Sequence, residues 1–201
     1  MRALYLHIDS STVVKGLQEI CSNNENKVVA YHYFTYTNRR SQIYNTLLKS
    51  LVLQLARRRK SSQEVATAAY IRADSGGRAL DHDELEEALH NLLGLFGSVY
   101  IVIDALDECS ERGDVFDFLD TLRGWKMPGV QVLLSSKTME EIEEALIPLS
   151  VDKVHIKSSF VDDDIRKHVA FQLSNSRDFR RWDEADRLEI VARLTESSGG
   201  M

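Results

Sequence analysis

The 201-residue sequence predicts an α/β fold in which a parallel sheet is covered by helices on both faces. Short apolar runs typical of buried strands alternate along the chain with longer segments whose apolar residues recur every three or four positions, as on one face of a helix. The predicted strands are apolar almost throughout, which is typical of parallel strands buried on both faces. Strands that are separated by helices pair in parallel through right-handed crossovers, and this gives the three layers of the predicted core.

The first strong strand is Val28–Phe34, a run of β-branched and aromatic residues. In the segment after it, apolar residues recur at helical spacing from Ile43 to Leu55, so we expect an amphipathic helix there. Asn38 is its predicted N-cap. The basic run Arg57–Lys60 suits its carboxyl end, where the helix dipole favours positive charge. Such a run can also contact nucleic acid, but in an acidic chain a solvated helix end is the preferred interpretation.

The middle of the chain continues the alternation of helix and strand. The next helix has acidic residues in its opening turns, which the positive end of the helix dipole favours. The predicted elements in order are a loop at Ala73–Gly77, a helix around Leu85–Leu93, a strand at Val99–Asp104, a helix around Val115–Leu122, a strand at Val130–Leu134, an acidic helix at Glu140–Leu146 and a weak strand at Val154–Ile156.

After about residue 158 the strand pattern stops. We therefore predict an α/β core over residues 1–158 and the start of a helical domain over residues 159–201. Asp162 or Asp163 opens the first predicted helix, and Asp183, with Asp186 three residues on, opens the second in a capping-box-like arrangement. The apolar residues expected to face inward are Ile165, Val169 and Leu173 on the first helix, and Leu188, Val191 and Leu194 on the second.

Composition excludes several classes of protein. The net charge of −6 gives no general attraction to nucleic acid or to anionic lipid, so we expect neither a nucleic-acid partner nor a membrane. Cys21 and Cys109 lie far apart and form no CxxC pair, which excludes a disulfide scaffold and fits a reducing compartment. The apolar runs are too short to cross a bilayer, and the first residues lack the apolar core of a signal peptide. We expect a cytoplasmic protein.

The sharpest chemical signal is the segment Tyr100–Glu108, with the sequence YIVIDALDE. Asp104 closes an apolar strand, and Asp107 and Glu108 follow three and four positions later. A carboxylate at a strand end can hold Mg²⁺, and a second acid one turn on can orient or deprotonate a water molecule. The alternative is a buried strand that ends in an ordinary polar turn, and spacing alone leaves both interpretations open.

These residues resemble a known family. VYIVIDALDEC resembles the Walker B segment of NACHT-type STAND P-loop NTPases, and most of all the nephrocystin-3-like N-terminal domains that abound in filamentous fungi. VVAYHYFTYTNRRSQIYNTLLKSLVLQLARR resembles the strand-plus-helix block of that family, and VQVLLSSKTMEEIEEAL resembles its sensor strand with the helix that follows. The similarity extends over most of the chain from about Ser10, so it implies a P-loop NTPase-like core, incomplete at the N-terminus, followed by a small helical domain.

The resemblance assigns roles by position. It implies Asp104 as the Mg²⁺-associated residue and Asp107 and Glu108 as the catalytic acids that activate water. Ser135-Ser136-Lys137 matches a sensor motif usually written Thr-Ser-Arg, so Ser136 and Lys137 are the implied nucleotide-binding residues. Lys137 supplies a positive charge without the bidentate fork of arginine. Ala105 stands where the family often has glycine.

The phosphate-binding motif of the family is absent. A P-loop has the pattern GxxxxGK[ST], in which backbone N–H groups cradle the phosphates, and the only glycine before residue 76 is Gly16. Either the chain is a truncated product of a longer NTPase, or it is a degenerate paralogue that has lost ATP chemistry. The chain end at Ser197–Met201 resembles a segment that continues into another helix in relatives, and this favours truncation.

Two functions follow from the resemblance. The first is part of a signalling module that in relatives binds ATP or ADP with Mg²⁺, switches conformation and oligomerises to activate an attached effector. The second is a non-catalytic scaffold or protein-interaction module derived from an NTPase. In both cases we expect protein partners or self-association through the core, with effector and repeat domains in full-length relatives, and no ATP hydrolysis by this chain alone.

Overall fold

The computed structural model describes residues 2–6, 10–72, 78–149, 152–154, 158–175 and 183–197. The chain forms two compact units, Met1–Val154 and His155–Met201. The predicted loop at Ala73–Gly77 and the chain end beyond Ser197 lie outside the described residues. Among the described residues, no helix is long and apolar enough to span a membrane.

The first unit is built on a five-stranded sheet with the strand order β2-β3-β4-β1-β5. Each pair of neighbouring strands is parallel, as the sequence predicts. Parallel strands end at the same edge, so polar residues that follow different strands meet there. The strands are β1 (Arg2–Leu6), β2 (Lys27–Tyr33), β3 (Ser98–Asp104), β4 (Val130–Ser135) and β5 (Asp152–Val154).

Strand β1 is the element of the sheet that the sequence analysis did not assign. It lies between β4 and β5, with Leu6 in register with Ser135 on one side and Val154 on the other. Pairing on both edges stabilises a five-residue segment whose own pattern is too short to be distinctive. The weak strand expected at Val154–Ile156 is β5, which ends at Val154, and residues 155–157 lie outside the described part.

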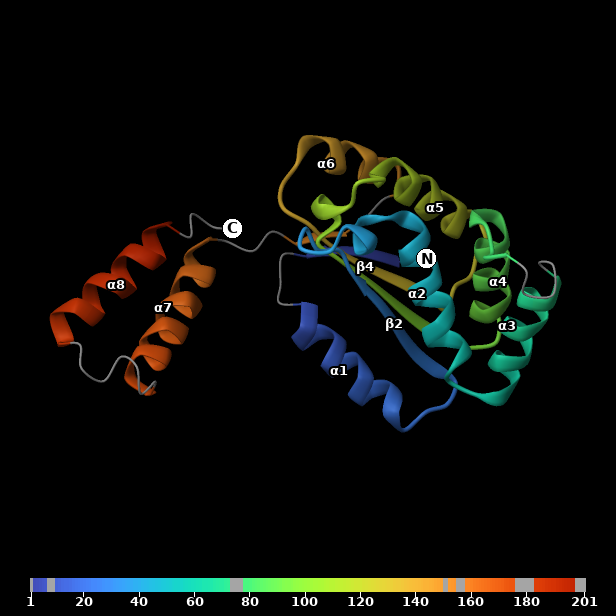
Figure 1. The fold of residues 1–201 in the computed structure, drawn as a ribbon, viewed down its shortest axis with the longest axis horizontal. Helices are drawn as coiled ribbons and strands as arrows, with labels where there is room; N and C mark the ends of the chain where they lie inside the picture. The colour runs from blue at the N-terminus through green and yellow to red at the C-terminus, as the bar shows by residue number, and fades with distance from the viewer. Residues whose placement is uncertain are drawn as a thin grey trace. The chain divides into compact units, whose positions relative to one another are not determined.

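The helices of the first unit cover both faces of the sheet, and this confirms the predicted α/β fold. Figure 1 shows α1 on one face and α2, α4 and α5 on the other. The helices are α1 (Ser10–Ser22), α2 (Tyr44–Ala56), α3 (Lys60–Arg72), α4 (His82–Leu93), α5 (Arg112–Gly124) and α6 (Glu140–Leu146), with short 3-10 turns η1 (Arg39–Gln42), η2 (Leu106–Glu108) and η3 (Ile147–Leu149).

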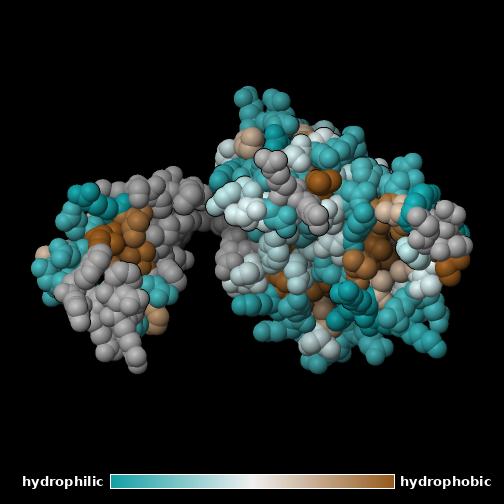
Figure 2. All heavy atoms as spheres, viewed as in Figure 1, coloured by the Kyte–Doolittle hydropathy of each residue, from teal (hydrophilic) through white to brown (hydrophobic). Residues whose placement is uncertain are grey.

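The core lies between the sheet and the helices on the α2 face. The apolar stripes predicted for α2 and α4 are buried there, with Leu51 and Leu89 fully inaccessible to solvent. Ile101 of β3 and Phe118 of α5 meet them in the same cluster. On the face of this unit seen in Figure 2, hydrophilic residues cover most of the surface, with apolar patches between them.

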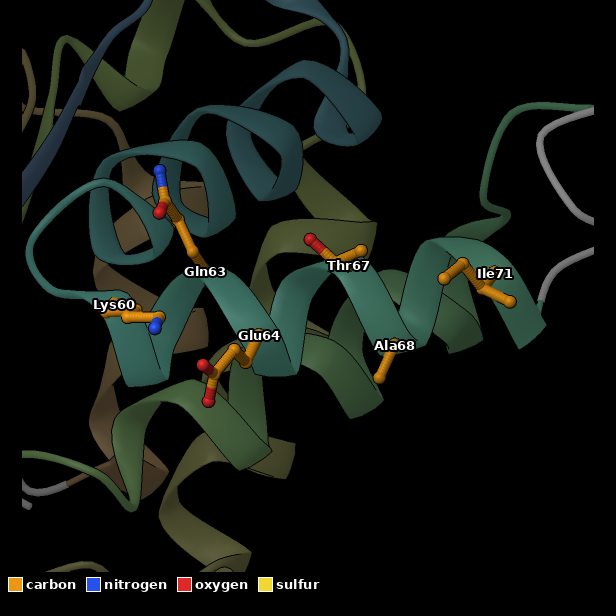
Figure 3. Close-up of a pocket in the computed structure, with 6 residues that line it drawn as sticks. All are labelled: Lys60, Gln63, Glu64, Thr67, Ala68 and Ile71. Atoms are coloured by element: carbon orange, nitrogen blue, oxygen red, sulfur yellow. The ribbon is translucent and has the colours of Figure 1, made fainter.

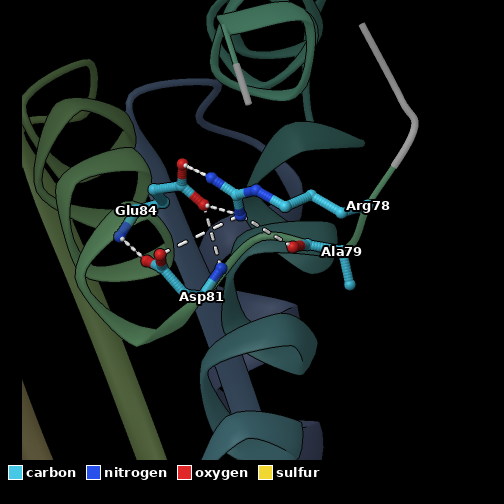
Figure 4. Close-up of polar contacts among 4 residues, drawn as sticks. All are labelled: Arg78, Ala79, Asp81 and Glu84. Atoms are coloured by element: carbon cyan, nitrogen blue, oxygen red, sulfur yellow. Dashed lines mark hydrogen bonds and ion pairs between the residues drawn. The ribbon is translucent and has the colours of Figure 1, made fainter. Parts of the chain in front are cut away.

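The start of α4 confirms the role expected of its acidic first turn. Asp81 is the N-cap: its side chain accepts the N–H of Glu84 at 3.0 Å, and Glu84 accepts the N–H of Asp81 at 2.9 Å, which completes a capping box. Arg78 pairs with Glu84 and also donates to the carbonyl of Ala79 (Figure 4). The hydrogen bond from Arg78 lowers the pKa of Glu84 below its usual range.

The ends of α2 differ from the prediction. Asn38 is not its N-cap, because the helix begins after Ile43, which makes no side-chain cap. The first N–H group, that of Tyr44, donates instead to Glu111 Oε2 at 2.8 Å. The helix ends at Ala56, and Lys60 begins α3, which the sequence analysis did not assign. The buried residues of α3 are Ser62 and Ala69, so this helix has no apolar stripe to reveal it.

Arg59 in the basic run turns inward. Its guanidinium lies 4.5 Å from the centre of the Phe96 ring and donates to the carbonyl of Leu95. A cation over an aromatic face is attracted by the ring quadrupole. Arg59 therefore binds the turn between α2 and α3 to the segment that follows α4. The four basic residues therefore do not form one exposed stripe that would follow a phosphate backbone.

The second unit contains α7 (Ser158–Asn175) and α8 (Glu184–Ser197), which pack against each other. Helix α7 begins four residues before Asp162. Asp183 caps α8 as expected, accepting the N–H of Asp186 at 2.8 Å. Leu173 and Val191 are buried, but Leu188 and Leu194 are 64% and 48% exposed, so the apolar face predicted for α8 is only partly covered.

Candidate functional site

The candidate site lies where β3 and β4 end side by side. Ile103 is in register with Leu134, so the next residues, Asp104 and Ser135, are neighbours. The hydroxyl of Ser135 donates to Asp104 Oδ1 and accepts the N–H of Ala105 at 3.2 Å. Ser135 is buried, and its single hydroxyl therefore fixes both the carboxylate and the backbone at the end of β3.

The chain turns sharply after Asp104. Ala105 has φ 54° and ψ 50°, the left-handed region in which an L-residue with a Cβ is strained. This explains on physical grounds why glycine suits this position, as the resemblance implied. The turn carries Leu106, Asp107 and Glu108 into the 3-10 turn η2 and points the acids away from the strand direction.

We expect Ala105→Gly to raise the free energy of unfolding by about 1 kcal/mol, because it relieves left-handed strain that costs roughly 1–2 kcal/mol while adding unfolded-state entropy. Chemical denaturation measures the change. Ala68→Gly, at an exposed position inside α3, is the matched control and should lower the stability by about 1 kcal/mol. Equal destabilisation by both substitutions would contradict the strain at Ala105.

The structure brings Asp107 and Lys137 together. Asp107 Oδ1 accepts the backbone N–H of Lys137 at 3.1 Å, and Lys137 Nζ lies 4.0 Å from Asp107 Oδ2. The Asp107 side chain is only 10% exposed, whereas that of Lys137 is 60% exposed. Ser136 is buried, and its hydroxyl donates to the carbonyl of Lys137 at 2.8 Å. Asp107 thus binds the segment after β4 mainly through a backbone group, which does not depend on the lysine side chain.

Glu108 bonds to the segment after β2, on the other side of β3 from β4. Its Oε2 accepts the backbone N–H of Tyr36, at 2.5 Å, in the turn after β2. Three further residues join the same region without any signal in the sequence: Gln42, Ser110 and Glu111. The carbonyl of Gln42 accepts both the N–H and the hydroxyl of Ser110, each at 3.0 Å.

The remaining polar groups near the site are structural. Burial raises the pKa of Cys109 to about 11, so its thiol is neutral near pH 7 and is not a nucleophile. Burial lowers the pKa of His32, whose Nε2 lies 3.0 Å from the carbonyl of Ser41. Burial, followed by the hydrogen bond to Glu86, raises the pKa of Tyr44, which keeps this phenol protonated.

The three carboxylates are all engaged in hydrogen bonds within the protein. Over the described ranges, no three His, Cys, Asp or Glu side chains come together as metal ligands. Asp104 accepts the hydroxyl of Ser135 and Asp107 accepts the N–H of Lys137, both at the end of β4. Glu108 accepts the N–H of Tyr36 after β2, so the three carboxylates bond to two different segments. The sequence also has no GxxxxGK[ST] to hold the phosphates. The roles assigned to Asp104, Asp107, Glu108, Ser136 and Lys137 remain predictions.

A hollow of about 490 Å³ lies away from these residues, on α3. Figure 3 shows its lining side chains along one helix. The lining residues are Lys60, Gln63, Glu64, Thr67, Ala68 and Ile71. They carry one cation, one carboxylate, one amide, one hydroxyl and two apolar groups spread along a helix face, which does not resemble a catalytic constellation.

Comparison with protein families gives a match over residues 8–137, well over half of the chain, to the model described as nephrocystin 3, N-terminal. The chain belongs to the nephrocystin 3 N-terminal domain family. Together with the parallel sheet, this makes the first unit a P-loop NTPase-like domain of that family. The matched region includes β2, β3, β4 and every residue of the candidate site described above. Comparison with curated proteins gave no match.

Among solved structures, this nephrocystin 3 family member is similar to the Aeropyrum pernix ORC1 protein in complex with DNA, with 17% identity and a TM-score of 0.48 over 96% of this chain and 55% of that one. A chain of Drosophila ORC bound to DNA has 12% identity and a TM-score of 0.48, and the alignment covers 96% of this chain and 46% of that one. C. elegans PCH-2 has 13% identity and a TM-score of 0.35, and the alignment covers 96% of this chain and 58% of that one. These likenesses are too distant to carry an argument about function.

Proposed function

We propose that this chain is a non-hydrolysing, NTPase-like scaffold of a signalling protein, acting through contacts with other proteins. One observation carries the proposal: the two acids that would activate water in the family, Asp107 and Glu108, both accept backbone N–H groups of neighbouring segments. Their hydrogen bonds hold the fold together at the end of β3. The segment has kept the acidic pattern of its relatives and uses it for structure.

Physical chemistry supports the absence of turnover. Phosphoryl transfer depends almost entirely on positioning and on electrostatic stabilisation of the phosphates. A chain without the P-loop amides and lysine lacks most of that stabilisation. A general base must also reach the water it activates, and the hydrogen bonds of Asp107 and Glu108 to backbone N–H groups direct these carboxylates toward neighbouring segments.

Protein partners fit this function best. By resemblance, full-length relatives carry effector and repeat domains, and the core mediates self-association or contact with such partners. The net charge of −6 disfavours nucleic acid, since binding to a phosphate backbone is driven by cationic side chains.

The second candidate is the nucleotide-dependent switch of the family. The position of Asp104 favours it, because this carboxylate closes a parallel strand at the edge where ligands bind in α/β folds. In that case Asp104 holds Mg²⁺ and nucleotide binding changes the arrangement of the chain. The two candidates differ in whether Mg²⁺ and ATP bind at all.

Phosphate release from ATP and Mg²⁺ by the purified 201-residue chain tests the proposal. We expect no turnover above the background without protein, and no change on Asp104→Ala. Asp152→Ala, at an exposed carboxylate on β5, is the control for charge. Magnesium-dependent turnover that Asp104→Ala abolishes and Asp152→Ala retains would refute the proposal.

A further inference from the structure

We propose that Asp107, Glu108, Ser110 and Glu111 form a clamp that makes the segments after β2, β3 and β4 open and close as one cooperative unit. We call these four residues the strand-end clamp. Through Glu111, the segment after β3 also bonds the first N–H group of α2 and so fixes the start of that helix. The clamp goes beyond the proposed function, because it is a property of the fold that does not depend on whether nucleotide binds.

Three contacts join the clamp to the segment between β2 and α2. Glu108 accepts the N–H of Tyr36. Ser110 donates through its N–H and its hydroxyl to the carbonyl of Gln42. Glu111 accepts the N–H of Tyr44 at 2.8 Å. The partners follow the same order along both segments, so hydrogen bonds at Tyr36, Gln42 and Tyr44 hold the two segments side by side.

The strand-end clamp also bonds to the segment after β4. Asp107 accepts the N–H of Lys137 after β4. Arg112 holds the clamp itself in shape, donating to the carbonyls of Asp107 and Cys109 at 3.2 and 2.9 Å, and it pairs with Glu141 of α6 at 3.2 Å. One short segment therefore bonds to the backbone on both sides.

The segment between β2 and α2 depends on these bonds because it buries little of itself. Phe34 and Tyr44 at its two ends are buried, but Tyr36 is 75% exposed and the described side chains between them are half-buried or exposed. Other contacts also hold this segment: His32 Nε2 lies 3.0 Å from the carbonyl of Ser41, and the N–H of Phe34 donates to the carbonyl of Asp104 at 3.1 Å. A segment with few buried apolar contacts opens locally at low cost, so its hydrogen bonds decide whether it stays ordered.

Opening the clamp has a consequence for the surface. The backbone of Tyr36 is held by Glu108 while the side chain projects into solvent, so the closed clamp presents an exposed aromatic group in a fixed place. The same opening frees the first N–H of α2, because Glu111 is the acceptor of that group. An order–disorder change here therefore alters both the turn and the helix start.

Amide hydrogen exchange of the full chain, read by NMR at neutral pH, tests the clamp. In Glu108→Ala, exchange should accelerate about tenfold or more at Tyr36, the amide it bonds, and also at Tyr44, the amide held by Glu111. In Glu108→Gln the amide oxygen still accepts the bond, so exchange should stay within about threefold of the parent. Glu144→Ala, at an exposed position on α6, is the control and should change neither amide.

The reverse experiment uses Glu111→Ala, with faster exchange expected at both Tyr44 and Tyr36. Acceleration confined to the one amide that each side chain bonds would overturn the proposal, since the contacts would then be independent. If the alanine variants do not fold, Glu108→Gln and Glu111→Gln decide: a change of protection confined to the one amide that each side chain bonds would also overturn the proposal. This test measures amide exchange and not ATP turnover, so a failure of the clamp proposal can be told apart from a failure of the proposed function.

Discussion

Phe118→Ala should lower the free energy of unfolding by about 4 kcal/mol, within the 3–5 kcal/mol typical of removing a buried phenylalanine. Phe118 is 1% exposed, and its ring centre lies 5.9 Å from that of Tyr44 and 6.4 Å from that of Trp125. Truncation leaves a cavity between α5 and the start of α2. In a domain of this size the midpoint of thermal unfolding should fall by roughly 8–16 °C.

Denaturant unfolding followed by circular dichroism measures this change. Leu53→Ala is the control, because Leu53 lies on α2 but is 53% exposed. Its substitution should cost less than about 1 kcal/mol. A loss below about 1 kcal/mol in Phe118→Ala would contradict the placement of α5 against α2, and with it the position of the clamp between them.

Ser135→Val should lower the free energy of unfolding by about 3 kcal/mol. The substitution puts a methyl group in place of the hydroxyl that donates to Asp104 and accepts from Ala105, and it adds a second methyl group at Cβ. A carboxylate and an N–H group then lose their partner at a largely buried site, and each unsatisfied group costs roughly 1–3 kcal/mol.

Ser135→Thr separates the hydroxyl from the shape of the side chain. Threonine keeps the hydroxyl with the same branching as valine, so we expect it to recover at least half of the stability lost in Ser135→Val. Thermal unfolding of the three proteins under one buffer condition gives the comparison. Equal stability of the valine and threonine variants would show that the hydroxyl does not secure the end of β3.

The sequence predicted the strands and helices with strong periodicity. Val99–Asp104 and Val130–Leu134 are buried parallel strands because nearly every residue in them is apolar. The acidic first turn of α4 was predicted, but its capping box came from the structure. The contact between Asp104 and Ser135 was not predicted; it follows from the register of β3 and β4, in which both residues end their strands.

Other features depend on tertiary contacts that no local pattern encodes. Strand β1 forms by pairing with β4 and β5, and α3 buries Ser62 and Ala69 in place of an apolar stripe. Asn38 has the composition of a cap, yet the first N–H of α2 is satisfied by Glu111, which is 67 residues away in the chain. Leu188 and Leu194 have helical spacing but no described neighbour that buries them.

The contacts of Asp107 and Glu108 also could not be predicted from the sequence. Their spacing indicates a place at the end of a strand, but it does not state which way each side chain turns. The left-handed turn at Ala105 directs Asp107 toward Lys137 and Glu108 toward Tyr36. A pattern that resembles a P-loop NTPase-like family therefore predicted the fold and the location of the acids, while their bonding partners came only from the structure.

The most direct test is the thermal unfolding of the chain with and without 1 mM ATP and excess Mg²⁺ (on the order of 100 times a 10 μM dissociation constant). Because the strand-end acids are bonded to the backbone and no phosphate cradle is present in the sequence, we expect the midpoint to stay within about 1 °C. Binding at that affinity would stabilise the folded state by about 2.7 kcal/mol. A rise of roughly 5 °C or more that disappears in Asp104→Ala would contradict the account.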